Sequence, residues 1–161
     1  EQGVIFVYFV SEAEKMTNYL NDNGFHAAFI HQSMLSNQQI EVATQWNTDV
    51  LNIIITTFGY RPPIKEESAK FLIHFNMPCS IHKYVDDVVY YGNNRKTHSL
   101  VLYDDIDILR GKKLFTKCDI SKNIEQMRLF CSNKTKCRKQ FITELVQIPT
   151  ICNGTCDICS D

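Results

Sequence analysis

Four cysteines in the last quarter of the chain have the spacing of a metal site. Cys152, Cys156 and Cys159 lie close together, and Cys137 lies upstream of them. Short spacings let one turn present several thiolates to a tetrahedral ion, and a more distant cysteine completes the coordination shell. Gly154 suits the turn between the clustered ligands, because glycine adopts positive φ without steric cost. The pattern predicts a structural Zn²⁺ site whose ligands are Cys137, Cys152, Cys156 and Cys159.

The alternatives for these cysteines are a disulfide framework or a set of unrelated buried thiols. The chain has seven cysteines, an odd number, and no secretory leader precedes them, so we expect reduced thiols in an intracellular protein. Four thiolates would fill the coordination sphere and leave no position for a substrate or an activated water. We therefore expect the metal to stabilise structure and not to take part in catalysis.

Charge and hydropathy argue against two classes of protein. The chain has 161 residues, with 17 basic and 18 acidic side chains and a formal net charge of −1. This balance argues against binding nucleic acid through bulk positive charge. No apolar run approaches the length of a membrane span, so we expect no membrane association.

A local basic patch is nevertheless a candidate nucleic-acid site. Its members surround the first cysteine of the metal pattern and are Lys134, Lys136, Arg138 and Lys139. A patch of this kind would contact phosphates, so its binding would weaken with salt and would not depend on base sequence. The alternative is a solvated helical face without a ligand.

The segments before the metal pattern alternate between strand and helix. Short runs rich in β-branched and aromatic residues predict buried strands at residues 3–10, 25–30, 51–57, 71–75 and 99–103. Helical patterns separate several of these runs. This alternation predicts an α/β fold, in which helices cover both faces of a parallel sheet.

Two of the expected helices carry recognisable start signals. Ser11 followed by Glu14 has the spacing of a capping box. Ser36 followed by Gln39 repeats that spacing. We expect these serines to cap their helices, and Ile40 to lie on the apolar stripe of the second one.

The last third of the chain is predicted to be helical. Helical signals run over residues 104–115, 122–131 and 135–147, and no strand candidate follows them. Ile124, Met127 and residues 129–130 can pack against Phe141 and Leu145 of the last helix. Two short helices bury too little apolar surface to be stable alone, so we expect a small helical hairpin that zinc stabilises.

Three segments carry a family resemblance. Residues 71–78 read Phe-Leu-Ile-His-Phe-Asn-Met-Pro, residues 137–139 read Cys-Arg-Lys, and residues 156–159 read Cys-Asp-Ile-Cys. In this order they resemble the second RecA-like lobe of a RecQ-family DNA helicase followed by the zinc-binding subdomain of that family. The resemblance implies a RecA-like helicase C-terminal lobe over residues 1–104 and a helical zinc-binding subdomain over residues 105–161.

Two motif segments depart from the family pattern. Residues 58–67 contain two prolines and two glutamates where active members have a glycine-rich loop, and the prolines stiffen the loop and remove backbone donors. Tyr90 and Asn93 stand where the resemblance implies arginines, one of them the arginine finger on the γ-phosphate. Such a finger contributes about 10³–10⁵-fold to phosphoryl transfer, so we expect hydrolysis near background. Arg95 is a disfavoured substitute, because a neighbouring glycine is also lost.

These observations favour a catalytically inactive RecQ-helicase-like module. The chain contains no Gly-x-x-x-x-Gly-Lys-Ser/Thr loop, so the phosphate-binding lobe is not part of it. The resemblance implies a nuclear role in DNA repair, recombination or chromosome maintenance, with single-stranded or forked DNA or a protein as partner. One alternative is the C-terminal half of an ATP-dependent 3′–5′ DNA helicase that needs a first lobe. Another is a DNA-binding zinc module.

Overall fold

A computed structural model of the chain describes all residues except 66–68, 93–96, 116–119, 148, 150 and 161. The chain divides into two compact units. The first unit comprises Glu1–Asn76 and Asp87–Leu102, and the second comprises Met77–Asp86 and Tyr103–Asp161. The boundary that we expect between residues 104 and 105 from the resemblance stays a prediction.

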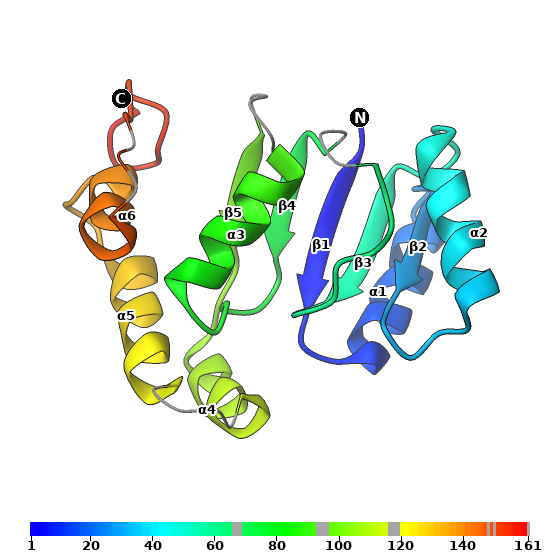
Figure 1. Cartoon of the computed structure of the whole chain (residues 1–161), viewed down its shortest axis with the longest axis horizontal. Coiled ribbons are helices and arrows are strands. Elements are labelled where there is room, and N and C mark those ends of the chain that lie inside the picture. The colour runs from blue at the N-terminus through cyan, green and yellow to red at the C-terminus, as the bar shows by residue number, and fades with distance from the viewer. Residues whose placement is uncertain (66–68, 93–96, 116–119, 148, 150, 161) are drawn as a thin grey trace. The chain divides into compact units, whose positions relative to one another are not determined.

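The first unit contains a five-stranded sheet with the order β2-β3-β1-β4-β5 (Figure 1). The strands are β1 (Gly3–Val7), β2 (Ala27–Ile30), β3 (Ile53–Thr57), β4 (Phe71–His74) and β5 (His98–Val101). Every pair of neighbouring strands is parallel. The prediction of an α/β fold with a parallel sheet is confirmed. All five predicted strands are present and shorter than predicted, and β5 begins one residue before its predicted start.

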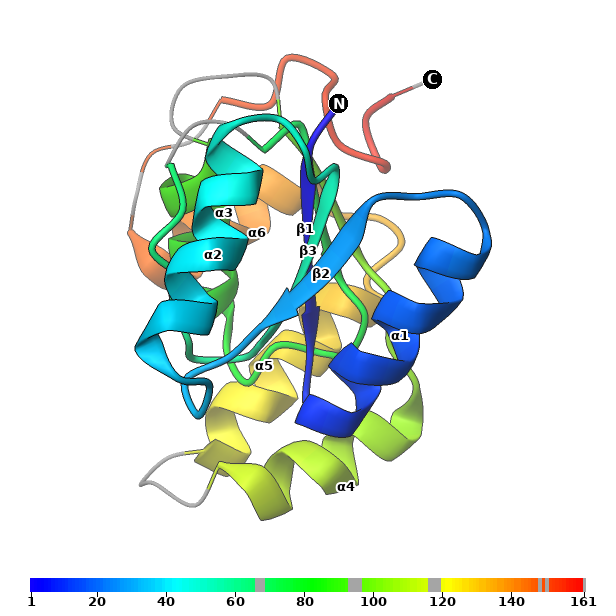
Figure 2. The same cartoon turned by 90° about the vertical axis from the view of Figure 1, so that its right-hand side faces the viewer.

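Helices cover both faces of this sheet (Figure 2). Helix α1 (Val10–Asp22) packs on one face, and α2 (Ser36–Asn47) and α3 (Ile81–Gly92) pack on the other. Successive side chains of a strand point to opposite faces. Accordingly, Val4 and Phe6 of β1 join the core beneath α2 and α3, whereas Ile5 and Val7 join the core beneath α1. Burial on both faces explains why β1 reads as a continuous apolar run.

The capping signals in the sequence were misread. Helix α1 begins at Val10, so Ser11 lies inside it, and the carboxylate of Glu12 accepts the N–H of Phe9 at 3.2 Å. Helix α2 begins at Ser36, so Leu35 is its N-cap residue. The N–H of Leu35 donates to the side chain of Gln38 at 3.2 Å. The observed pair of residues lies two positions earlier than predicted in α1 and one position earlier in α2, because a serine inside the first turn cannot act as the cap.

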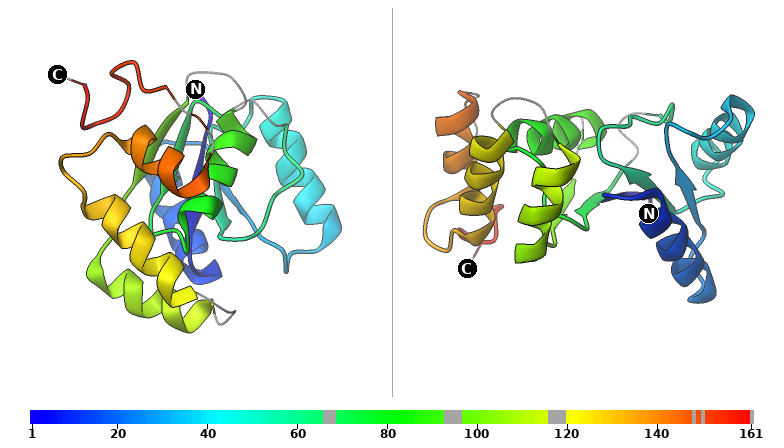
Figure 3. Two further views of the ribbon diagram at one scale, coloured as in Figure 1. Left: turned by 60° about the vertical axis from the view of Figure 1, so that its left-hand side comes forward. Right: turned by 90° about the horizontal axis from the view of Figure 1, so that it is seen from below.

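The second unit contains the helices α4 (Asp105–Leu114), α5 (Ile120–Ser132) and α6 (Arg138–Val146) (Figure 3). Ile124, Met127 and Phe130 of α5 are buried, and the rings of Phe130 and Phe141 lie 5.5 Å apart. Leu129 is 46% exposed and lines a hollow of about 220 Å³ together with α6. The predicted contact between α5 and α6 is therefore present. Within the described ranges, no helix has the length and apolar character needed to cross a membrane.

Candidate metal centre

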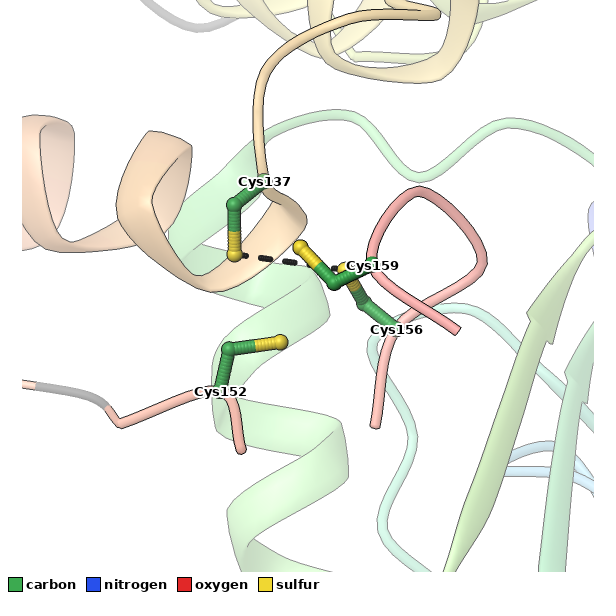
Figure 4. A group of neighbouring side chains, drawn as sticks. All are labelled: Cys137, Cys152, Cys156 and Cys159. Atoms are coloured by element: carbon green, nitrogen blue, oxygen red, sulfur yellow. Dashed lines mark hydrogen bonds between the residues drawn. The ribbon is translucent and has the colours of Figure 1, made fainter. Parts of the chain in front are cut away.

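The four cysteines predicted as ligands come together in the second unit (Figure 4). The sulfur atoms of Cys137, Cys152, Cys156 and Cys159 all lie within 4.8 Å of one another. A tetrahedral Zn²⁺ about 2.3 Å from each thiolate would hold neighbouring sulfurs roughly 3.8 Å apart. The sulfurs of Cys156 and Cys137 are 3.9 Å apart, and none of these four cysteines is in a disulfide. The donor set and its dimensions therefore fit a four-thiolate metal site.

Two segments of backbone position the first two sulfurs. Cys137 is the residue before the first turn of α6, and its carbonyl accepts the N–H of Phe141 at 3.0 Å. The Cys152 carbonyl accepts the N–H of Thr155 at 3.0 Å, which closes a turn through Gly154. Gly154 has a φ of 72°. L-residues rarely adopt this conformation, so the expectation that Gly154 suits the turn through its positive φ is confirmed.

A second turn carries the last two sulfurs. The Cys156 carbonyl accepts the N–H of Cys159 at 3.1 Å and that of Ser160 at 2.9 Å. This single turn of chain brings two ligands separated by two residues to the same side, as short ligand spacings require.

Arg138 connects the ligand turns to the helices. Its guanidinium donates from Nε to Oδ1 of Asp157 at 2.9 Å and from Nη2 to Oδ2 at 2.8 Å. It also donates to the carbonyl of Phe130 at the end of α5 and lies 5.3 Å over the Phe130 ring. Hydrogen bonding between the two side chains raises the pKa of Arg138 and lowers the pKa of Asp157. Arg138 follows the candidate ligand Cys137, and Asp157 follows the candidate ligand Cys156, so one ion pair joins the two halves of the candidate site.

The thiols of the site differ in acidity. Burial raises the pKa of Cys152, but hydrogen bonds from the backbone of Cys156 and the thiol of Cys137 outweigh burial and lower that pKa to about 6. Hydrogen bonding with the sulfurs of Cys156 and Cys137 raises the pKa of Cys159 to about 12. Against the effect of burial, hydrogen bonds from the backbone of Arg138 and Ile158 also lower the pKa of Cys156. The thiolate is the form that binds metal, and the lowered pKa values of Cys152 and Cys156 favour that form.

The candidate nucleic-acid residues mostly have partners inside the second unit. Lys136 forms an ion pair with Glu144, and Lys139 donates from Nζ to the carbonyl of Ile151 at 3.0 Å. Arg138 is the residue that joins the ligand turns. Lys134 is exposed. The assignment of these four residues to phosphate binding stays a prediction, and sequence reasoning missed the role of Arg138 in the site, although its position beside a ligand was a signal.

The degenerate motif segments of the first unit pack on their own core. Ile64 is 5% exposed, and the Tyr60 hydroxyl donates to Oε1 of Gln39 at 2.7 Å. The Arg61 guanidinium lies 4.6 Å from the centre of the Tyr90 ring. The next tyrosine on α3, Tyr91, is only 1% exposed. The other motif residues named from the sequence, Asn93, Arg95, Glu66 and Glu67, lie outside the described residues.

A buried polar pair joins β4 to α3. Nε2 of His74 lies 3.4 Å from Oδ2 of Asp87, and the two side chains are 0% and 1% exposed. The imidazole stacks on the Phe6 ring at 4.5 Å. Thirteen residues separate the pair in the chain, and no local pattern connects them, so sequence reasoning did not find it.

Comparison with known proteins agrees with this architecture. Residues 1–89 match the family described as helicase conserved C-terminal domain. The ATP-dependent DNA helicase Q-like 4B of Arabidopsis thaliana is 29% identical over 188 residues, covering 99% of this chain and 16% of that protein. The ATP-dependent DNA helicase Q1 of Mus musculus is 26% identical over 168 residues, covering 99% of this chain and 25% of that protein. The chain thus spans between a sixth and a quarter of the length of these relatives.

Solved structures show the same fold at low identity. The E. coli DEAD-box protein SrmB, bound to regulator of ribonuclease activity A, superposes with a TM-score of 0.59 at 16% identity over 70% of this chain and 68% of that one. The C-terminal domain of S. cerevisiae Dbp5, bound to Gle1 and IP6, gives 0.57 at 12% identity over 78% of this chain and 82% of that one. With the family match over residues 1–89 and the RecQ-type relatives over nearly the whole chain, the protein belongs to the helicase conserved C-terminal domain family and is a RecQ-like helicase C-terminal lobe.

Proposed function

We propose that this RecQ-like lobe is a catalytically inactive interaction module with a structural Zn²⁺. The observation that carries the proposal is the side chain at position 90. Tyr90 occupies a place where the family resemblance implies an arginine, and its ring is packed against Arg61 at 4.6 Å. A tyrosine carries no positive charge for a γ-phosphate, and the loss of such a charge removes about 10³–10⁵-fold in rate.

Zn²⁺ is the metal that the donor set favours. Four thiolates in a tetrahedral arrangement are typical of structural zinc sites, and Cys137, Cys152, Cys156 and Cys159 supply four sulfurs within 4.8 Å of one another. A zinc ion there would hold the start of α6 against the two ligand turns. Elemental analysis of the purified chain tests this: we expect one zinc per chain, and a different metal or none would contradict the assignment.

The partner is DNA or a protein. The relatives are named as DNA helicases, which supports DNA and a nuclear location. The structures of the neighbours Dbp5 and SrmB contain bound proteins, which supports a protein. Fluorescence anisotropy with single-stranded and forked DNA, at low and physiological salt, separates the two. Tight binding with a steep salt dependence favours DNA, and no binding at low salt favours a protein.

A second candidate function is the C-terminal half of an ATP-dependent helicase that requires a first lobe. One observation favours it: Arg61 holds a guanidinium directly over the residue that replaces the family arginine. An arginine whose guanidinium plane is fixed by stacking is a strong hydrogen-bond donor to phosphate. A displaced arginine of this kind could contact a nucleotide bound to another lobe.

ATP hydrolysis after mixing with a competent RecQ first lobe distinguishes the two functions. For the inactive module, we expect the wild-type chain to leave hydrolysis at the level of the first lobe alone. Stimulation by the wild-type chain that disappears in Arg61→Ala would instead establish the second function. The Tyr90→Arg variant is the companion measurement, because a gain of activity there would identify the missing arginine as the cause of inactivity.

A further inference from the structure

Helix α4 has two faces of opposite character. On one face Asp107 is 2% exposed, and its Oδ2 accepts the N–H of Met77 at 3.1 Å. On the other face Ile106 is 48% exposed and Leu109 is 62% exposed. Residues three apart are neighbours on a helix surface, so these two side chains form one apolar stripe. Helices normally turn such a stripe toward a core, and this one faces solvent.

The two ends of α4 carry opposite charges. Asp104 and Asp105 lie at the start, and Lys112 and Lys113 lie in the last turn. Two copies of the helix placed antiparallel would set the acidic end of each against the basic end of the other. If Ile106 of one copy meets Leu109 of the second, Asp105 lies about 3 Å along the axis from Lys112 of the second copy, at 1.5 Å rise per residue.

We propose that this α4 surface, defined by Ile106, Leu109, Asp105 and Lys112, mediates a two-fold symmetric association between two copies of the chain. In such an association the same patch is used on both partners, so the patch must be complementary to itself. The apolar stripe and the reversed charges satisfy this condition together. The association goes beyond the function proposed above and does not depend on nucleotide, DNA or another protein.

Helix α5 lies beside α4 (Figure 3). Two of its charged residues extend the polar rim of the surface. Glu125 and Arg128 form an exposed ion pair and interact electrostatically with Lys112 and Asp105 respectively. Polar rims around a small apolar centre are typical of interfaces between proteins. A ten-residue helix buries less area than the roughly 1,200 Å² of a stable complex, so we expect a weak and reversible dimer.

Sedimentation velocity tests the association with the zinc-loaded, reduced chain, since reduction excludes dimers linked by cysteine. We expect the average mass to rise from 18.7 kDa toward twice that value as the concentration increases into the range of weak complexes. Leu109→Glu should remain monomeric throughout. The matched control is Ile40→Glu on α2, where the isoleucine is also 62% exposed, and it should associate like the wild type. A wild-type chain that stays monomeric, or a Leu109→Glu chain that dimerises, overturns the proposal.

Charge exchange tests the antiparallel arrangement. Asp105→Lys makes both ends of α4 basic, and Lys112→Asp weakens the basic end, so each variant alone should associate about five- to tenfold more weakly. An equimolar mixture of the two should recover association, because each variant then supplies the charge that the other lacks. Failure of the mixture to recover, with circular dichroism showing both variants folded, would refute the antiparallel pairing.

Discussion

Replacing Arg138 by alanine should weaken metal binding although Arg138 is not a ligand. The change removes the three hydrogen bonds to Asp157 and the one to the carbonyl of Phe130. Asp157 is 62% exposed, so solvent screening limits the ion pair to about 0.2–1 kcal/mol. The Arg138 side chain is 18% exposed, and a charged donor to a carbonyl contributes about 1.5–3 kcal/mol. The free energy lost is therefore roughly 2–4 kcal/mol.

Part of this loss of free energy should appear as a lower metal affinity, because the ion pair holds the turn that carries Cys156. Residues that orient metal ligands typically change metal affinity by about 10–100-fold, which corresponds to roughly 1.4–2.7 kcal/mol. Competition with a chromophoric chelator measures this affinity directly. We expect Arg138→Ala to release zinc at a chelator concentration about 10–100-fold lower than the wild type requires.

Arg128→Ala is the matched control for this experiment. Arg128 also forms a two-pronged ion pair, with Glu125 on α5, but neither residue adjoins a ligand. We expect its zinc affinity to equal that of the wild type. Wild-type zinc affinity in Arg138→Ala would refute the claim that Arg138 positions the ligand turn, and equal losses in both variants would show a general effect of removing an arginine from the helices.

Three further predictions concern other parts of the chain. Cys156→Ser should lose zinc and unfold mainly the second unit, as seen by elemental analysis and by hydrogen exchange; full metal retention would contradict the four-thiolate site. Asp87→Ala should destabilise the first unit by roughly 3 kcal/mol in urea unfolding, because it leaves buried His74 without its carboxylate, whereas Asp86→Ala at the adjacent exposed position should have little effect. Changing Lys134, Lys136 and Lys139 together to glutamate should weaken any DNA binding at low salt, and unchanged anisotropy titrations would place the binding surface elsewhere.

Local features of the molecule could be predicted from the sequence. The five parallel strands follow from short apolar runs, because burial on both faces demands apolar residues at every position of β1. The clustering of Cys152, Cys156 and Cys159 follows from their spacing, because cysteines a few residues apart can share a turn. The left-handed turn at Gly154 is also a local feature, because a positive φ depends on the residue type at that position.

Contacts between distant residues were decided by the tertiary structure. Ile40 lies on the predicted apolar stripe of α2 yet is 62% exposed, because the sheet covers only the sector of the helix that carries Ala43 and Trp46. Arg138 looks like one of several basic residues, and only folding brings it to Asp157, 19 residues away.

The pairing of His74 with Asp87 was likewise decided by the tertiary structure. Periodicity in a sequence indicates which side chains face the interior. The partner that each of these side chains contacts depends on how the helices and strands pack. The sequence by itself therefore determined the strands, the helical hairpin and the four cysteines that could hold a metal ion. The tertiary structure alone decided which charges pair, which apolar side chains remain exposed, and that Arg138 joins the two segments that carry the clustered cysteines.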